Sequence, residues 1–150
     1  MSVHQRIAIS GASGLIGTAL VGHLKAEGHT VQRLVRRAPV GADEVQWDPQ
    51  TGFVDLEPLR GVNAVIHLAG VGVGDKRWSK KYKSEILNSR LLGTTAIANA
   101  VTELKPQVFI SASAIGWYGE SGNRAVVETD RVGDDFLAAV CREWEAAADL

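Results

Sequence analysis

The heptapeptide GASGLIG at residues 11–17 decides how the whole chain is interpreted. It follows the apolar segment RIAIS at residues 6–10, which is short and β-branched and therefore indicates a buried strand. It also opens a segment, residues 14–27, in which apolar side chains recur at helical spacing until Gly28 provides a stop. The sequence thus predicts a strand, a glycine-rich turn and a helix in direct succession.

Three glycines spaced GxxGxxG in this context are typical of a turn that binds the pyrophosphate of a dinucleotide. We expect Gly11 to permit the tight turn, Gly14 to let the pyrophosphate approach the backbone, and Gly17 to let the helix pack on the sheet. The helix N-terminus would offer unpaired N–H groups to the phosphates. The alternative is a glycine-rich turn without a ligand. The residues predicted to bind the cofactor here are Gly11, Ser13, Gly14, Leu15, Ile16 and Gly17.

Strand and helix patterns alternate along the rest of the chain. Helices are predicted over residues 79–103, with a break or bend, and over 136–149. Alternation of apolar strands with helices implies a parallel sheet covered on both faces, so the predicted fold class is α/β, a Rossmann-like doubly wound sheet. Further strands are predicted at residues 30–35, 62–68 and 107–111, with a weaker one at 44–47.

The number of predicted strands indicates whether the chain contains a full Rossmann domain. Four or five strands are fewer than the six of two full mononucleotide-binding halves, and the last predicted helix runs to the final residue without a C-cap. Residues 1–150 are therefore expected to form one NAD(P)-binding Rossmann domain that is the N-terminal part of a longer protein and lacks the C-terminal substrate region.

Composition excludes several classes of protein. A net charge of −1 argues against a nucleic-acid protein that works by bulk charge, and a single cysteine excludes an intrachain disulfide framework. The four histidines are scattered, so no metal site is predicted. The absence of an apolar run of about 20 residues argues against a membrane span, and together with the lone cysteine it favours a cytoplasmic protein.

The end of the second predicted strand selects the dinucleotide. An acidic residue there would bind the ribose 2′-hydroxyl of NAD, whereas arginine suits the 2′-phosphate of NADP. The sequence reads RLVRR at residues 33–37 and contains no acid. We therefore favour NADP over NAD, with Arg36 and Arg37 as phosphate ligands and Ser13 as an added hydroxyl; a solvated basic turn is the alternative.

These motifs resemble the short-chain dehydrogenase/reductases, and more narrowly the atypical subgroup known as epimerase family proteins. The resemblance spans nearly the whole chain and includes AVIHLAG at 64–70, NSRLLGT at 88–94 and SASAIGWYG at 111–119. It implies that Leu68, Ala69 and Gly70 line the adenine and ribose side of a cofactor, and that Ser111 lies beside the nicotinamide. It also makes a homodimer possible.

The chain departs from the superfamily's catalytic pattern. Where YxxxK would fall, the sequence has Phe136 and Val140, and a family asparagine is replaced by Arg90. Phenylalanine has no proton to donate and valine no charge. Ser113 remains a candidate hydrogen-bond donor to a substrate oxygen, and Tyr118 is a candidate substitute acid.

Three hypotheses compete. The first is an NADP-dependent oxidoreductase or epimerase that acts on a small molecule of unknown identity, with a nucleotide sugar as one option. The second, motivated by Phe136 and Val140, is a non-catalytic NADP-binding regulatory or sensor protein. The third is an interaction fragment with a dead cofactor site, which predicts no affinity for nucleotide.

Overall fold

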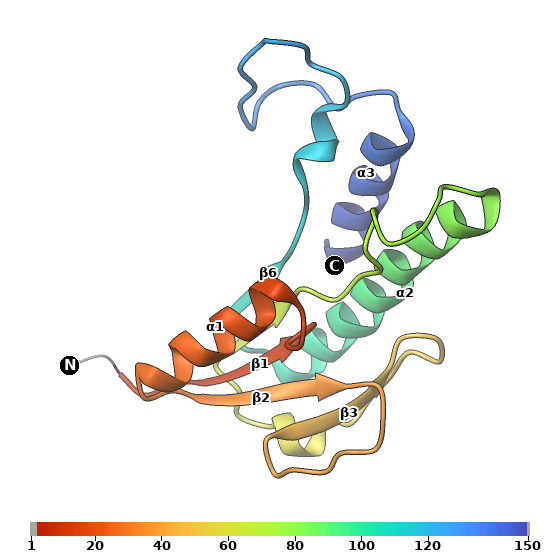
Figure 1. The fold of residues 1–150 in the computed structure, drawn as a ribbon. Coiled ribbons are helices and arrows are strands. Elements are labelled where there is room, and N and C mark those ends of the chain that lie inside the picture. Colours follow the sequence, from red (N-terminus) through yellow and green to blue (C-terminus); the bar gives the residue numbers. More distant parts are fainter. Residues whose placement is uncertain (1–2, 150) are drawn as a thin grey trace.

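Parallel strands form the centre of the fold (Figure 1). The computed structural model describes residues 3–149 and orders the sheet β4-β3-β2-β1-β5-β6. All neighbours pair in parallel except the short β4, which runs antiparallel to β3. The predicted α/β, Rossmann-like class is thereby confirmed. The strands are β1 (Arg6–Ser10), β2 (Thr30–Val35), β3 (Glu44–Asp48), β4 (Phe53–Val54), β5 (Ala64–His67) and β6 (Val108–Ser111).

Alternate residues of β1 anchor one helix on each face of the sheet. Ile7 and Ile9 pack with the apolar side of α1 (Leu15–Ala26), whereas Ala8 belongs to the core beneath α2 (Lys80–Leu104). Figure 1 shows α1 and α2 on opposite sides of the strands. A parallel strand that is buried on both faces has apolar residues at successive positions, and Ile7, Ala8 and Ile9 form such a run in β1.

The two longer connections end in capped helices. Ser79 caps α2 by accepting the Tyr82 N–H at 3.1 Å, and Asp135 caps α3 (Phe136–Ala148) by accepting the Ala138 N–H at 2.8 Å. The break or bend predicted within residues 79–103 is wrong, because the helix is continuous from residue 80 to 104. Its N-terminal half packs on α3 through Tyr82 and Ile86, and its C-terminal half packs on the sheet through Ile97, so tertiary contacts support the long helix.

The sequence did not predict three short elements. Strand β4 and the 3-10 turns η1 (Glu57–Leu59) and η2 (Ile115–Tyr118) contain two to four residues each, too few for a periodic pattern. The weak strand expected at 44–47 is in contrast a full member of the sheet. Its Trp47 is 2% exposed and meets the ring of His67 edge-on at 6.0 Å between centroids.

His67 is the polar centre of the core. Its Nδ1 lies 2.6 Å from the Ser10 hydroxyl on β1, and its Nε2 lies 3.1 Å from the Thr94 hydroxyl on α2. Burial lowers the pKa of His67 to about 4, so the ring is neutral at physiological pH. A neutral ring satisfied on both nitrogens joins β1, β5 and α2 and has no nitrogen left for a metal.

The close approach of α1 to the end of β1 predicts a sharp difference between two glycines of the same helix. A Cβ on Gly17 would lie 2.2 Å from the Gly11 carbonyl oxygen, whereas a Cβ on Gly22 would meet nothing within 4 Å. We expect Gly17→Ala to cost about 1–3 kcal/mol of unfolding free energy through overpacking. Gly22→Ala, the matched control, should gain about 0.5–1 kcal/mol from helix propensity. Urea denaturation of both variants measures the difference; equal effects would contradict this packing.

Candidate functional site

A cleft of about 1210 Å³ opens at the carboxyl ends of the central strands. It is bounded by the turns that follow β1, β2 and β5, and these strands flank the point where the chain reverses its direction of winding. Ligands of open α/β sheets bind at this position. Eight of the predicted cofactor residues line the cleft: Gly11, Ser13, Gly14, Arg36, Arg37, Leu68, Ala69 and Gly70.

The N-terminus of α1 supplies the polar groups at the cleft's centre. Gly14 is the N-cap residue and provides no side-chain acceptor. Within the described residues, the backbone N–H groups of residues 15–17 have no hydrogen-bond partner, and the first capping-type bond runs from the Thr18 N–H to the Gly14 carbonyl at 2.9 Å. Free N–H groups at the positive end of a helix dipole form a site for an anion.

Three predicted cofactor residues of the same turn do not line the cleft with their side chains. Those of Leu15 and Ile16 are 93% and 69% exposed, so only their backbone can contribute there. Gly17 faces the Gly11 carbonyl and serves the packing of α1. The turn is held against β5 as well, because a Cβ on Gly11, at φ +71°, would lie 2.7 Å from the Leu68 carbonyl carbon.

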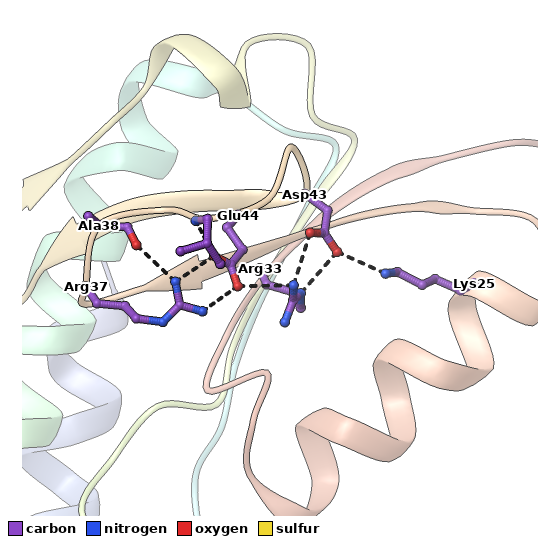
Figure 2. A network of polar contacts seen from close by, with 7 residues as sticks. Lys25, Arg33, Arg37, Ala38, Asp43 and Glu44 are labelled. Carbon is purple, nitrogen blue, oxygen red and sulfur yellow. Dashed lines mark hydrogen bonds and ion pairs between the residues drawn. The ribbon is translucent and has the colours of Figure 1, made fainter.

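The basic end of β2 is organised by two acids that precede and begin β3 (Figure 2). Arg37 donates two hydrogen bonds to the Glu44 carboxylate, at 2.7 and 2.6 Å. Arg33 donates to both oxygens of Asp43, at 3.1 and 3.0 Å, and lies 3.2 Å from Glu44. Lys25 of α1 reaches Asp43 at 3.0 Å. Of the three arginines at residues 33, 36 and 37, Arg33 and Arg37 are therefore neutralised by carboxylates.

Both carboxylates are held in the ionised state. The hydrogen bonds from Arg37, together with the Val40 N–H at 2.9 Å, lower the pKa of Glu44 to about 2. Hydrogen bonds from Arg33, the larger cause, and from Lys25 lower the pKa of Asp43 to about 2. Glu44 also closes the turn after β2, since it binds Arg37 and the Val40 amide at the same time.

Arg36 differs from its neighbours. It lines the cleft, its side chain is exposed, and within residues 3–149 it forms no ion pair. The acids that engage Arg33 and Arg37 do not themselves line the cleft. The cleft therefore presents the guanidinium of Arg36 as a free cation with its full set of donors.

The two candidate catalytic residues lie together in a second, smaller cavity of about 390 Å³. Ser113 follows β6, and Tyr118 ends η2; Glu128 and Glu145 line the same cavity. The Ser113 hydroxyl donates to the Glu145 carboxylate at 2.5 Å, so the serine presents its lone pairs to the cavity in this arrangement. The predicted cofactor residue Ser111, half-buried at the end of β6, lines neither cavity.

The positions that would carry YxxxK are packed between α3 and α2. Val140 is 3% exposed and lies in one apolar cluster with Tyr82 and Ile86. Phe136 meets Trp78 edge-on at 5.5 Å between ring centroids, and Lys83 lies over both rings. Lys83 ends the basic segment KRWSKKYK at residues 76–83, so part of this segment packs on aromatic rings.

Several cleft residues were missed by sequence reasoning. Trp47 belongs to β3, Pro49 and Gln50 follow it, and polar side chains of α2 form the opposite wall. A sequence pattern can show that the polar residues of α2 lie on one side of a long helix. It cannot show that this side faces a cleft, because that depends on where the sheet lies. Glu145 lies 32 residues from Ser113, so no local pattern joins them. The missed wall residues of α2 and the loop before it are Asp75, Lys81, Ser84, Glu85, Asn88 and Ser89.

Residues 3–149 offer neither a metal site nor a membrane-spanning helix. No group of three or more histidine, cysteine or acidic side chains is placed to hold a metal ion. No helix in this part of the chain combines the length and apolarity needed to cross a membrane. The one cysteine, Cys141, is buried in α3 at 3% exposure.

The sequence and the fold are similar to those of known proteins. The model of the NAD dependent epimerase/dehydratase family matches residues 7–135. An epimerase family protein of Mycobacterium leprae is 44% identical over 141 residues, which cover 94% of this chain and 46% of the relative. The chain thus spans about half the length of the relatives it matches.

Two solved structures are similar over nearly all of the chain. A nucleoside-diphosphate sugar epimerase from Corynebacterium glutamicum superposes with a TM-score of 0.83 at 38% identity and covers 98% of this chain and 31% of its own. The human epimerase family protein SDR39U1, solved with NADPH, gives a TM-score of 0.81 at 31% identity and covers 95% of this chain and 48% of its own.

The ionised state of Glu44 generates a prediction about acid stability. Because the pKa of Glu44 is lowered from 4.5 to about 2 on folding, its contribution is complete above pH 4.5 and is lost as the pH falls towards about 2. We expect Glu44→Gln to lower the melting temperature at pH 7, and the gap between wild type and variant to narrow between pH 4.5 and about 2. Thermal unfolding followed by circular dichroism at pH 7, 4.5 and 3 tests this.

Glu57→Gln is the control for that series. Glu57 pairs with Arg60 across 2.7 Å, but the two side chains are 78% and 67% exposed. An exposed pair of this kind contributes at most about 1 kcal/mol. A Glu44 variant that behaved like the Glu57 variant at every pH would show that the Arg37–Glu44 contact does not stabilise the fold.

Proposed function

Because the chain belongs to the NAD-dependent epimerase/dehydratase family, we propose that its large cleft binds a nicotinamide dinucleotide, with NADP preferred over NAD. The observation that carries this proposal is the open N-terminus of α1, with free N–H groups at residues 15–17, next to the unpaired Arg36. The N–H groups suit the pyrophosphate and Arg36 suits the 2′-phosphate. The NADPH in the related human structure supports the same assignment.

Each wall of the cleft has a role in this proposal. Gly11 and Gly14 bring the backbone close to the pyrophosphate, and the Ser13 hydroxyl adds a donor for a phosphate. Leu68 and Ala69 form the wall for adenine and ribose, and Gly70 ends this wall where the nicotinamide half of the dinucleotide would begin. Arg37 contributes less to phosphate binding than Arg36, because Glu44 already engages two of its donors.

For the reaction, we propose an oxidoreductase or epimerase that acts on a small molecule, with nucleotide sugars as the first class to test. The nucleoside-diphosphate sugar epimerase among the similar structures supports this class. Ser113 and Tyr118 would contact the substrate from the second cavity, where Tyr118 has a phenolic proton to donate and the Ser113 oxygen, whose proton is donated to Glu145, would accept a hydrogen bond from a substrate hydroxyl. The bound dinucleotide would supply hydride chemistry.

One observation favours a second candidate, a dinucleotide-binding protein without catalysis. Phe136 and Val140 are packed into apolar and aromatic surroundings, which leaves no cation or phenol at these positions. Consumption of NADPH with a panel of nucleotide sugars distinguishes the candidates. If catalysis occurs, Ser113→Ala and Tyr118→Phe should lower kcat by about 10²-fold or more without changing the Kd for NADPH. Binding without turnover on any member of the panel would favour the second candidate.

The phosphate assignment yields a direct binding prediction. We expect Arg36→Ala to raise the Kd for NADPH about tenfold, or about 1.4 kcal/mol, because one free guanidinium is lost from the 2′-phosphate. The Kd for NADH should change by less than about twofold, since NADH has no such phosphate. Isothermal titration calorimetry with both nucleotides measures the two effects.

Two further variants complete the comparison. Arg37→Ala should weaken NADPH less than Arg36→Ala, and Arg60→Ala, whose arginine lies outside the cleft and pairs with Glu57, should have no effect. Equal losses for NADPH and NADH in the Arg36 variant would refute a 2′-phosphate contact. No binding of either nucleotide by wild type would refute the cofactor site and favour an interaction role.

A further inference from the structure

Arg90 is a half-buried cation that none of the roles above employs. It lies on α2, and its Nη1 donates to the carbonyl of Val71 at 2.9 Å and to that of Ile86 at 3.1 Å. Its Cζ lies 4.8 Å from the centroid of the Trp144 ring on α3. Among residues 3–149 it forms no ion pair with a carboxylate. Burial lowers the pKa of the guanidinium, but arginine remains charged.

The contacts of Arg90 reach the wall of the large cleft. A Cβ on Gly70 would lie 3.4 Å from the Arg90 Cζ, so the guanidinium packs directly against a residue that lines the cleft. Val71, whose carbonyl it binds, lines the cleft as well. Arg90 therefore fixes the turn after β5 and places an uncompensated positive charge immediately behind it.

The order of the strands indicates which half of a dinucleotide this turn would meet. The pyrophosphate site follows β1, Arg36 follows β2 on one side of it, and Gly70 and Val71 follow β5 on the other side. A dinucleotide that crosses the switch point with its 2′-phosphate at Arg36 must extend its other half over β5. That half carries the nicotinamide.

We propose that Arg90 positions the nicotinamide end of the bound dinucleotide and favours its reduced form. This inference rests on the proposed function. The oxidised nicotinamide ring carries a positive charge and the reduced ring carries none, so a fixed cation behind Gly70 repels only the oxidised ring. Since the guanidinium is partly removed from water, this repulsion is screened less than it would be at an exposed arginine.

Three ligands separate this role from a structural one. 2′,5′-ADP reports the adenine half, and NADPH and NADP⁺ report the full dinucleotide in its two charge states. In Arg90→Gln, which keeps an amide donor for the Val71 carbonyl but removes the charge, the ratio of the NADP⁺ Kd to the NADPH Kd should fall about fivefold. Arg90→Lys should retain most of the ratio, and the Kd for 2′,5′-ADP should stay within about twofold in both variants.

Arg142→Gln is the matched control, because Arg142 is an exposed arginine of α3 whose side chain is 52% accessible. Melting temperatures of all variants show whether each is folded, and Arg90→Lys provides a charged variant if Arg90→Gln does not fold. Three results would overturn the proposal. The ratio of the NADP⁺ Kd to the NADPH Kd could be unchanged in Arg90→Gln, or this variant could lose affinity equally for all three ligands. The third is a ratio in Arg90→Lys as low as that in Arg90→Gln. If wild type binds 2′,5′-ADP but gains nothing from the nicotinamide half, the inference alone fails; if it binds none of the ligands, the proposed function fails with it.

Discussion

The close approach of the first turn of α1 to the end of β1 is the constraint on which the structure depends. The Gly11 carbonyl lies where a side chain on Gly17 would begin, and Gly11 itself lies against the backbone of Leu68. Only glycine fits both places. This contact sets the position of α1 on the sheet, leaves the N–H groups of residues 15–17 open to the cleft, and fixes the turns after β1 and β5 relative to one another.

Charged side chains surround the N-terminus of α1 on both sides of β1. The buried carboxylate of Glu44 and its neighbour Asp43 do not line the cleft, and they engage Arg33, Arg37 and Lys25. Arg36 is left facing it, at the end of the same strand. On the other side of β1, Arg90 is held by carbonyls and an aromatic ring in place of a carboxylate. The exposed Arg36 and the half-buried Arg90 thus lie on opposite sides of the helix N-terminus, and the exposed Lys81 lines the wall that α2 forms.

The site differs most from the superfamily's pattern between α2 and α3. Val140 packs with Tyr82 and Ile86, and Phe136 packs with Trp78, so this part of the domain is stabilised by apolar contacts. Polar groups suited to proton transfer gather instead after β6, where Ser113 donates to Glu145 and Tyr118 lies in the same cavity.

The sequence by itself determined the order of strands and helices, the glycine-rich turn and the basic end of β2. These features depend on residues close to one another along the chain, through periodicity, branching and turn chemistry. Only the tertiary structure decided which arginine is free, because Glu44 comes beside Arg33 and Arg37 through the pairing of β3 with β2. It likewise decided that Ser113 meets Glu145 and that Arg90 lies between Gly70 and Trp144. Such contacts depend on strand register and helix packing, which bring together residues that no local pattern connects.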